Sequence, residues 1–211
     1  MWDILLVDDH PIIIDGLKLV IKKFIAHCKI DMANDGDTAF EKIKHNNYDL
    51  IIMDVSLPNT DSFNTVSNIL AIKPGSKILM FSMNPEEMFA KRYLKMGAMG
   101  YISKDAPLNE IKNAIESALQ NTRYISPGLK EKLAMDVLDN NNQENQFDKL
   151  SPREFEIVQH LVHGDSVSEI SKMLNLHTST IGTHKARIFE KLHCHNIVEL
   201  AMMAKVHNII L

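Results

Sequence analysis

Five polar residues stand at wide intervals along the first half of the chain, and each closely follows a short apolar run. They are Asp8, Asp9, Asp54, Ser82 and Lys104. Short and nearly continuous apolar runs are typical of strands that are buried on both faces of a parallel sheet. Because the carboxyl ends of parallel strands meet at one edge of the sheet, we expect the five side chains to converge there.

Apolar runs alternate with helical segments throughout this region. The runs are Ile4–Val7, Ile30–Ala33, Leu50–Met53, Ile78–Phe81 and Gly100–Ile102. Between them, apolar residues recur with the three- and four-residue spacing of amphipathic helices. This alternation predicts an α/β, doubly wound, five-stranded parallel sheet with right-handed crossovers, whose active edge lies where the strand order reverses.

The three aspartates predict a site for a hard divalent cation. Three carboxylates packed together raise one another's pKa unless a cation neutralises them. The ligand set contains oxygen only, since it has no Cys and since His10 is too close in sequence to Asp9 to be an obvious ligand. Mg²⁺ is the natural choice for such a set. With the metal present, one carboxylate is free to attack a phosphoryl group, whose oxygens Lys104 and Ser82 can bind.

Four motifs in residues 1–120 resemble the receiver domain of two-component response regulators. They are Val7-Asp8-Asp9-His10-Pro11, Met53-Asp54-Val55-Ser56-Leu57-Pro58, Phe81-Ser82-Met83 and Gly100-Tyr101-Ile102-Ser103-Lys104-Asp105-Ala106. The resemblance implies a flavodoxin-like fold and phosphorylation by a partner sensor histidine kinase. It also implies that Asp54 is the phosphoacceptor.

The same resemblance assigns roles to the neighbouring residues. Asp9 would bind Mg²⁺ directly, Asp8 largely through water, and Ser56 through its backbone carbonyl. Ser82 and Tyr101 would form a switch pair, in which the hydroxyl moves to the phosphoryl group while the aromatic ring turns inward. Two positions depart from the family: Ser62 replaces a usual Gly and is expected to stiffen the loop after Asp54, and Asp105 follows Lys104 where many receivers have Pro.

Residues 148–211 predict a small all-α domain of four helices. A capping box, Ser151-Pro152-Arg153-Glu154, starts the first helix, which ends near Gly164. The others are expected at about 167–174, from Thr178 or Ser179 to His193, and at about 197–206. The second and third helices, joined by a turn at residues 175–177, have the pattern of a helix-turn-helix.

This segment resembles the LuxR-type DNA-binding domain of the NarL/FixJ subfamily. The resemblance rests on Leu150-Ser151-Pro152-Arg153-Glu154, Glu169-Ile170-Ser171-Lys172-Met173-Leu174, Ser179-Thr180-Ile181-Gly182-Thr183-His184, Lys191-Leu192 and Val198-Glu199-Leu200. It implies a recognition helix from Thr178 to His193 that binds double-stranded DNA. The expected DNA-contacting residues are Thr180, Thr183, His184, Lys185 and Arg187, with Thr183 facing the bases. Gly182 replaces a frequent Lys, which costs helix stability and removes a DNA contact.

Charge and composition limit the alternatives. Residues 148–211 hold seven Lys or Arg and seven Asp or Glu, so the basic residues of the third helix also fit a solvated surface. A neutral monomer should bind DNA weakly, and a homodimer on paired sites is expected. His193-Cys194-His195 is dense in metal ligands, but adjacent residues on a turn do not easily close a tetrahedral site.

The length of 211 residues exceeds that of a usual single domain, so two domains are expected. We expect a receiver domain at 1–120, a connecting helix and polar linker at 121–147, and a DNA-binding domain at 148–211. The helix would span Pro127–Leu138 as a spacer, and the linker would occupy 139–146. Two distant cysteines, the absence of a signal peptide and the lack of a membrane-length apolar run indicate a cytoplasmic protein that does not bind the membrane.

The sequence therefore predicts a phosphorylation-controlled transcription factor and not an enzyme. A phosphotransferase or phosphatase of the haloacid dehalogenase type is one alternative, but such enzymes usually have a second Asp two residues after the nucleophile, where this chain has Ser56. The other alternative is an interaction module, or pseudo-receiver, that works without phosphorylation.

Overall fold

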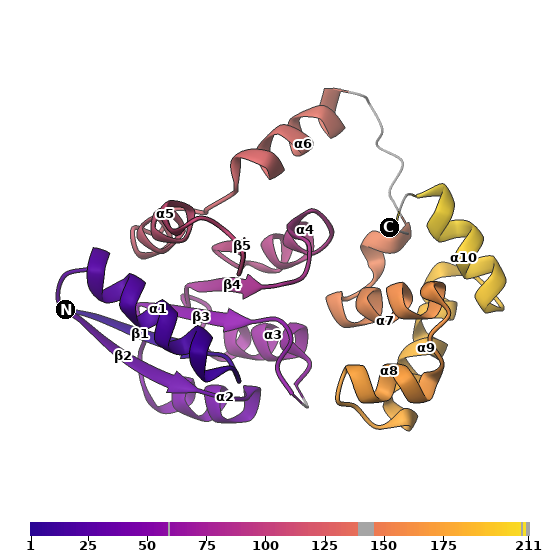
Figure 1. Ribbon diagram of the computed structural model, residues 1–211, viewed down its shortest axis with the longest axis horizontal. Helices are drawn as coiled ribbons and strands as arrows, with labels where there is room; N and C mark the ends of the chain where they lie inside the picture. The colour runs from indigo at the N-terminus through magenta and orange to yellow at the C-terminus, as the bar shows by residue number, and fades with distance from the viewer. Residues whose placement is uncertain (59, 139–145, 208, 210–211) are drawn as a thin grey trace. The chain divides into compact units, whose positions relative to one another are not determined.

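Figure 1 shows the computed structural model, which describes residues 1–58, 60–138, 146–207 and 209. The chain divides into two compact units, residues 1–141 and 142–211. Of the linker predicted at 139–146, only Gln146 lies within the described residues. No helix in the described part of the chain is both long enough and apolar enough to span a membrane.

The first unit contains a five-stranded sheet in which every neighbouring pair is parallel. The strand order is β2-β1-β3-β4-β5, and the strands are β1 (Trp2–Val7), β2 (Cys28–Ala33), β3 (Leu50–Asp54), β4 (Ile78–Ser82) and β5 (Gly100–Ser103). The chain moves from β1 outward to β2 and then returns past β1 to β3, so the strand order reverses between β1 and β3. The predicted doubly wound fold is confirmed.

Helices cover both faces of this sheet (Figure 1). They are α1 (Pro11–Phe24), α2 (Gly36–His45), α3 (Ser62–Ile72), α4 (Glu86–Met96) and α5 (Leu108–Leu119). One buried cluster joins α1 and α5 to every second residue of the inner strands, such as Ile4 and Leu6 of β1. The alternate residues of β1, Leu5 and Val7, are equally buried, because side chains in a strand alternate between its two faces. This burial on both faces explains why the strands are continuous apolar runs.

Helix α6 (Pro127–Leu138) is attached to α4, which adds to the spacer role expected from the sequence. The Ser126 hydroxyl donates a hydrogen bond of 2.7 Å to Glu86 Oε2 and accepts one of 3.1 Å from the Leu129 amide. The Leu129 side chain is buried. Lys132 also forms an ion pair with Glu87, with 3.0 Å between Nζ and Oε2. The start of α6 is therefore held by the first turn of α4.

The second unit begins with a 3₁₀ turn, Gln146–Lys149, and its described residues contain four α-helices. These are α7 (Pro152–His163), α8 (Val167–Met173), α9 (Thr178–Leu192) and α10 (Ile197–Val206). Ser151 and Glu154 form the predicted capping box, and Ser166 and Glu169 form a second one. Helix α9 ends one residue before the predicted His193, which caps it in the left-handed conformation with φ 55°. The predicted all-α class of this part of the chain is confirmed.

The contact between α4 and α6 should depend on pH through Glu86. Burial raises the pKa of Glu86 above its ordinary value of 4.5, although hydrogen bonds from Ser126 act in the opposite direction. A carboxyl with a raised pKa in the folded state contributes stability that is present below the ordinary pKa and is lost as the pH rises through the folded-state pKa. Glu86→Gln does not titrate and keeps an acceptor for Ser126.

We therefore expect the stability of Glu86→Gln relative to the natural protein to increase between about pH 4 and about pH 7. Urea unfolding of both proteins at the two pH values measures this difference. Glu131→Gln is the control, because Glu131 is an exposed glutamate of α6. A pH-independent difference for Glu86→Gln would contradict the prediction.

Candidate functional site

One lysine and two aspartate side chains meet at the carboxyl edge of the sheet. Lys104 Nζ lies 2.6 Å from Asp8 Oδ2 and 2.9 Å from Asp54 Oδ2, and all three side chains are almost completely buried. Asp8 follows β1, Asp54 ends β3 and Lys104 follows β5, so the strand order brings them together. The Lys104 amide also donates to the Ser82 carbonyl oxygen at 2.8 Å, which fixes the start of the loop that carries the lysine.

Burial and charge act in opposite directions on these groups. Burial raises the pKa of Asp54, and the charge and hydrogen bond of Lys104 only partly offset that effect. For Lys104, burial alone lowers the pKa, but the hydrogen bond that it donates to Asp8 and the charge of Asp54 outweigh it, so its pKa is raised. The lysine therefore stays charged, while the buried Asp54 carboxylate lacks full compensation.

The acidic cluster has the composition and spacing of a cation site. One ligand atom from each of Asp8, Asp9, His10 and Asp54 lies within 4.8 Å of all the others. Asp9 Oδ1 is buried and has no hydrogen-bond donor of good geometry among the described residues. A buried carboxylate oxygen without a well-aligned donor is a suitable ligand for a hard cation, so these residues fit Mg²⁺.

His10 lies inside the acidic cluster. The sequence argument did not treat it as an obvious ligand, because it is close to Asp9 in sequence, but its Nδ1 lies 2.9 Å from Asp9 Oδ1 and 3.2 Å from Asp8 Oδ1. His10 is the N-cap of α1, and its extended backbone turns the imidazole back over the aspartates. The cluster therefore includes one nitrogen that the sequence argument left out.

Ser82 and Tyr101 are both linked to the backbone of Asn84. Ser82 ends β4, is fully buried and accepts a hydrogen bond of 3.1 Å from the Asn84 amide. The Tyr101 hydroxyl donates to the Asn84 carbonyl oxygen at 2.9 Å, and its ring is buried. The two predicted switch residues thus contact the same residue of the β4–α4 connection, with the ring turned inward.

Ser56 and Ser62 both follow Asp54 in the sequence. Ser56 lies beside Asp54, as expected, whereas Ser62 lies in a helix and not in the loop. Ser56 is exposed, and its amide donates to Asp54 Oδ1 at 3.2 Å. The expectation that Ser62 stiffens a loop is wrong, because Asp61 caps α3 and Ser62 is its first residue. Ser62 is buried, and its hydroxyl lies 2.8 Å from the Tyr93 hydroxyl of α4.

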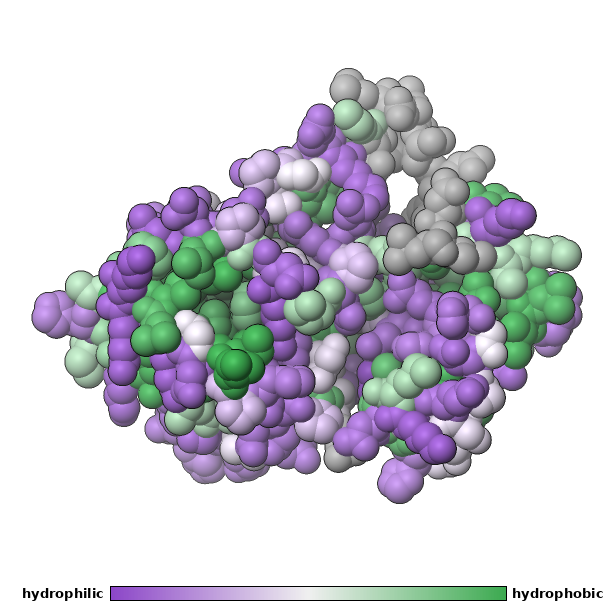
Figure 2. Space-filling view, viewed as in Figure 1, coloured by the Kyte–Doolittle hydropathy of each residue, from purple (hydrophilic) through white to green (hydrophobic). Residues whose placement is uncertain are grey.

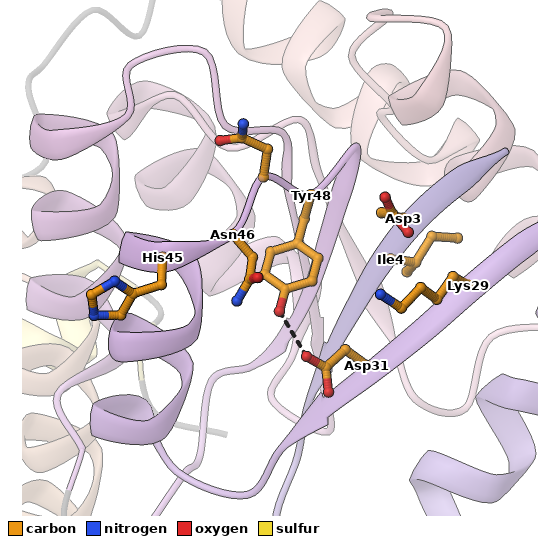
Figure 3. Close-up of a pocket in the computed structure, with 8 residues that line it drawn as sticks. Asp3, Ile4, Lys29, Asp31, His45, Asn46 and Tyr48 are labelled. Atoms are coloured by element: carbon orange, nitrogen blue, oxygen red, sulfur yellow. Dashed lines mark hydrogen bonds between the residues drawn. The ribbon is translucent and has the colours of Figure 1, made fainter.

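A separate polar pocket of about 300 Å³ lies near the opposite edge of the sheet (Figure 3). Its lining includes Asp3 of β1, Asp31 of β2 and Tyr48. The Tyr48 hydroxyl donates to Asp31 Oδ2 at 2.8 Å, and Lys42 pairs with Asp31 Oδ1 at the same distance. These contacts satisfy Asp31 internally, and the pocket contains none of the clustered carboxylates around Asp54.

Helix α9 presents some of the predicted DNA-contacting side chains to solvent. Thr183 and Arg187 are exposed, whereas Thr180, His184 and Lys185 are partly buried. Lys185 Nζ lies 5.5 Å from the centre of the Phe189 ring, a cation–π contact that directs it along the helix. The Thr183 hydroxyl donates to the Ser179 carbonyl oxygen at 3.0 Å. The exposed surface of α9 is therefore centred on Thr183 and Arg187.

Gly182 is exposed on the same helix, and a methyl group added there would meet nothing within 4 Å. We therefore expect Gly182→Ala to stabilise the second unit by about 0.5–1 kcal/mol, because glycine in a helix interior loses more backbone entropy than alanine. Chemical unfolding monitored by circular dichroism measures this change.

The control is Gly164→Ala at the C-cap of α7, where φ is 103°. That backbone conformation strains any residue with a Cβ, so this variant should be destabilised. Equal effects of the two substitutions would show that helix propensity does not govern position 182.

Comparisons with known proteins agree with both parts of this description. Residues 4–116 match the response regulator receiver domain, and residues 148–204 match the bacterial regulatory proteins of the luxR family. Response regulator UvrY of Escherichia coli (strain K12) is 30% identical over 209 residues, which cover 99% of this chain and 96% of UvrY.

Two solved structures of RcsB share the fold. One is RcsB from Salmonella enterica serovar Typhimurium bound to promoter rprA in the presence of the phosphomimetic BeF3⁻. It is 20% identical, has a TM-score of 0.61 and covers 97% of this chain and 99% of that chain. The other contains two RcsB dimers bound to two parallel DNAs, is 20% identical, has a TM-score of 0.58 and covers 97% of this chain and 98% of that chain.

This chain belongs to the response regulators of the NarL/FixJ type, which join a receiver domain to a LuxR-type DNA-binding domain. It is accordingly a transcription regulator, and the family match favours this class over the haloacid dehalogenase alternative.

Proposed function

We propose that Asp54 accepts a phosphoryl group from a sensor histidine kinase in the presence of Mg²⁺, and that this step controls dimerisation and DNA binding. The observation that carries the proposal is the buried contact of Lys104 with both Asp8 and Asp54, beside the acidic cluster. A buried carboxylate with one cation next to it and a cation site in front of it is suited to accept a phosphoryl group.

Mg²⁺ would be held by Asp8, Asp9 and Asp54, with the Ser56 carbonyl as a further ligand. When bound, it would neutralise negative charge on the carboxylates and on the phosphoryl oxygens. Asp54 supplies the attacking oxygen, and the imidazole nitrogen of the kinase phosphohistidine leaves as the new O–P bond forms. Lys104, already 2.9 Å from Asp54, can then pair with the phosphoryl oxygens.

Ser82 would transmit the change to the rest of the receiver. Its hydroxyl now accepts a hydrogen bond from the Asn84 amide, and it can turn to donate to a phosphoryl oxygen. Since the Tyr101 hydroxyl is hydrogen-bonded to the Asn84 carbonyl, movement of the β4–α4 connection would affect Tyr101 directly. A phosphoryl group that adds about 1.5 to 2 negative charges would bias the receiver toward a second conformation.

For DNA binding, we propose a homodimer in which two α9 helices enter successive major grooves. RcsB, which shares the fold, binds DNA as dimers in the structure described above. In this chain, Val198, Met202 and Val206 form an exposed apolar row on α10, at a spacing of four residues. Figure 2 shows the corresponding apolar patch over α10 at the right of the view. DNA binding and phosphorylation by a kinase place the proposed site of action in the cytoplasm.

Phosphorylation should occur at Asp54 alone. Incubation with acetyl phosphate and Mg²⁺ should add one phosphoryl group, measured by the mass of the intact protein. Asp54→Asn should remain unlabelled, and Asp9→Ala or addition of EDTA should abolish labelling. Cys194→Ser is the control, since Cys194 lies in the second unit. Undiminished labelling of Asp54→Asn would refute the assignment.

DNA binding should depend on the exposed face of α9. Arg187→Ala or Lys185→Ala should weaken binding to all sequences and reduce the salt dependence, by about one unit of the log–log slope per lost phosphate contact. Thr183→Ala should mainly reduce discrimination between sequences.

A binding titration at two salt concentrations, with and without phosphorylation, measures both effects. The control is Lys205→Ala, which removes an equal charge from an exposed site on α10. An equal loss with Lys205→Ala would show that overall charge, and not the α9 face, determines binding.

The pseudo-receiver alternative keeps one supporting observation. Tyr101 is already buried and bonded to Asn84, although inward rotation is expected only after phosphorylation. If the protein binds DNA equally well in its natural form and as Asp54→Asn, and acetyl phosphate has no effect on either, this alternative is correct.

A further inference from the structure

Ser62 forms a buried hydrogen bond that a glycine at the same position would lack. Its hydroxyl lies 2.8 Å from the Tyr93 hydroxyl, and the two residues are 6% and 0% exposed. The bond joins the first turn of α3, which follows the Asp54 loop, to the middle of α4. It therefore links two elements that are 31 positions apart in sequence.

Tyr93 connects this bond to the switch residue. Its ring lies 6.0 Å from that of Tyr101, with 31° between the ring planes, and 6.3 Å from that of Phe63. Tyr93 thus packs between the start of α3 and Tyr101. Because its hydroxyl is bonded at one side and its ring is packed at the other, rotation of Tyr93 would disturb both contacts.

Because both hydroxyls are buried, this hydrogen bond favours the conformation in which Ser62 and Tyr93 remain in contact. A buried hydroxyl that loses its partner has no access to water and incurs the cost of desolvation. Any movement of Tyr101 that draws Tyr93 away from Ser62 would carry this cost. The bond consequently favours the arrangement in which Tyr93 stays in place and Tyr101 lies against it.

We propose that the Ser62–Tyr93 hydrogen bond holds the Tyr101 ring in its buried position before any phosphoryl group is present. Ser62 and Tyr93 are then positioning residues that set how far the receiver is switched in its resting state. The consequence for DNA binding rests on the proposed function, whereas the placement of the Tyr101 ring does not.

The direct test measures the solvent exposure of Tyr101 in the full-length protein without phosphorylation. 3-Fluorotyrosine placed at position 101 keeps the hydroxyl, and a soluble gadolinium chelate accelerates the ¹⁹F relaxation of exposed rings. We expect a protected ring in the natural protein. Ser62→Ala should increase the exposed population by about 2- to 10-fold, the change that corresponds to one hydrogen bond of ordinary net strength.

A double-mutant cycle distinguishes the bond from general packing. Tyr93→Phe removes the partner hydroxyl and should have the same effect as Ser62→Ala, and the double variant should add nothing further. Ser67→Ala is the matched control, because Ser67 is an exposed serine on the same helix. If one variant fails to fold, the other still tests the proposal.

The proposal is overturned if Tyr101 is exposed in the natural protein, if both single variants leave it protected, or if their effects simply add. The same measurement in the Asp54→Asn background should give the same result. Failure of the natural protein to take up a phosphoryl group at Asp54 would refute the proposed function while leaving the ring measurement valid.

A second readout follows for DNA binding. If the bond favours the switched arrangement at rest, Ser62→Ala should lower the DNA affinity of the unphosphorylated protein and increase the ratio of phosphorylated to unphosphorylated affinity. A purely structural role would reduce stability and leave that ratio unchanged, which would contradict the functional part of the proposal.

Discussion

The contact of Lys104 with Asp8 and Asp54 is the interaction on which the receiver depends. Two buried carboxylates at the ends of adjacent strands would repel each other strongly without a cation between them. The strand order places the lysine there, because β5 lies beyond β4 while its following loop returns over the edge of the sheet. Removing one partner of such a cluster costs more than the cluster itself contributes, which restricts substitutions at all three positions.

A second consequence concerns how the site is connected to the rest of the receiver. Asn84 receives contacts from Ser82 and Tyr101, and two residues later Glu86 binds Ser126 at the start of α6. The β4–α4 connection therefore lies between the charged cluster and α6, the helix that precedes the second unit in the sequence. The variants of Ser62, Tyr93 and Glu86 perturb different parts of this connection.

The sequence predicted those features that depend on local pattern. Strands buried on both faces produce apolar runs, and the Ser151 capping box is encoded within four residues, so both were recognisable. Contacts between distant elements could not be recognised from the sequence. The hydrogen-bond partner of Ser62 is on α4, and the partner of Ser126 is also on α4. His10 was set aside because sequence distance says little about where a side chain points when the backbone is extended at a helix N-cap. The partial burial of Lys185 likewise depends on its packing against Phe189.

If dimerisation controls DNA binding as proposed above, the charges of the second unit explain why it is an effective point of control. Helix α9 contains three basic residues, Lys185, Arg187 and Lys191, and one acidic residue, Glu190. Lys191 forms an ion pair with the buried Glu154, with 2.6 Å between Nζ and Oε2. Lys185 and Arg187 therefore remain as its cations for phosphate, and Gly182 adds none. Each phosphate contact contributes about one unit to the salt dependence, so a monomer gains little affinity from this helix. Joining two such helices makes the second contact intramolecular and raises the affinity without any new residue. In the proposed mechanism, a DNA-binding domain that binds weakly as a monomer would make occupancy of DNA follow the fraction of the protein that is dimeric.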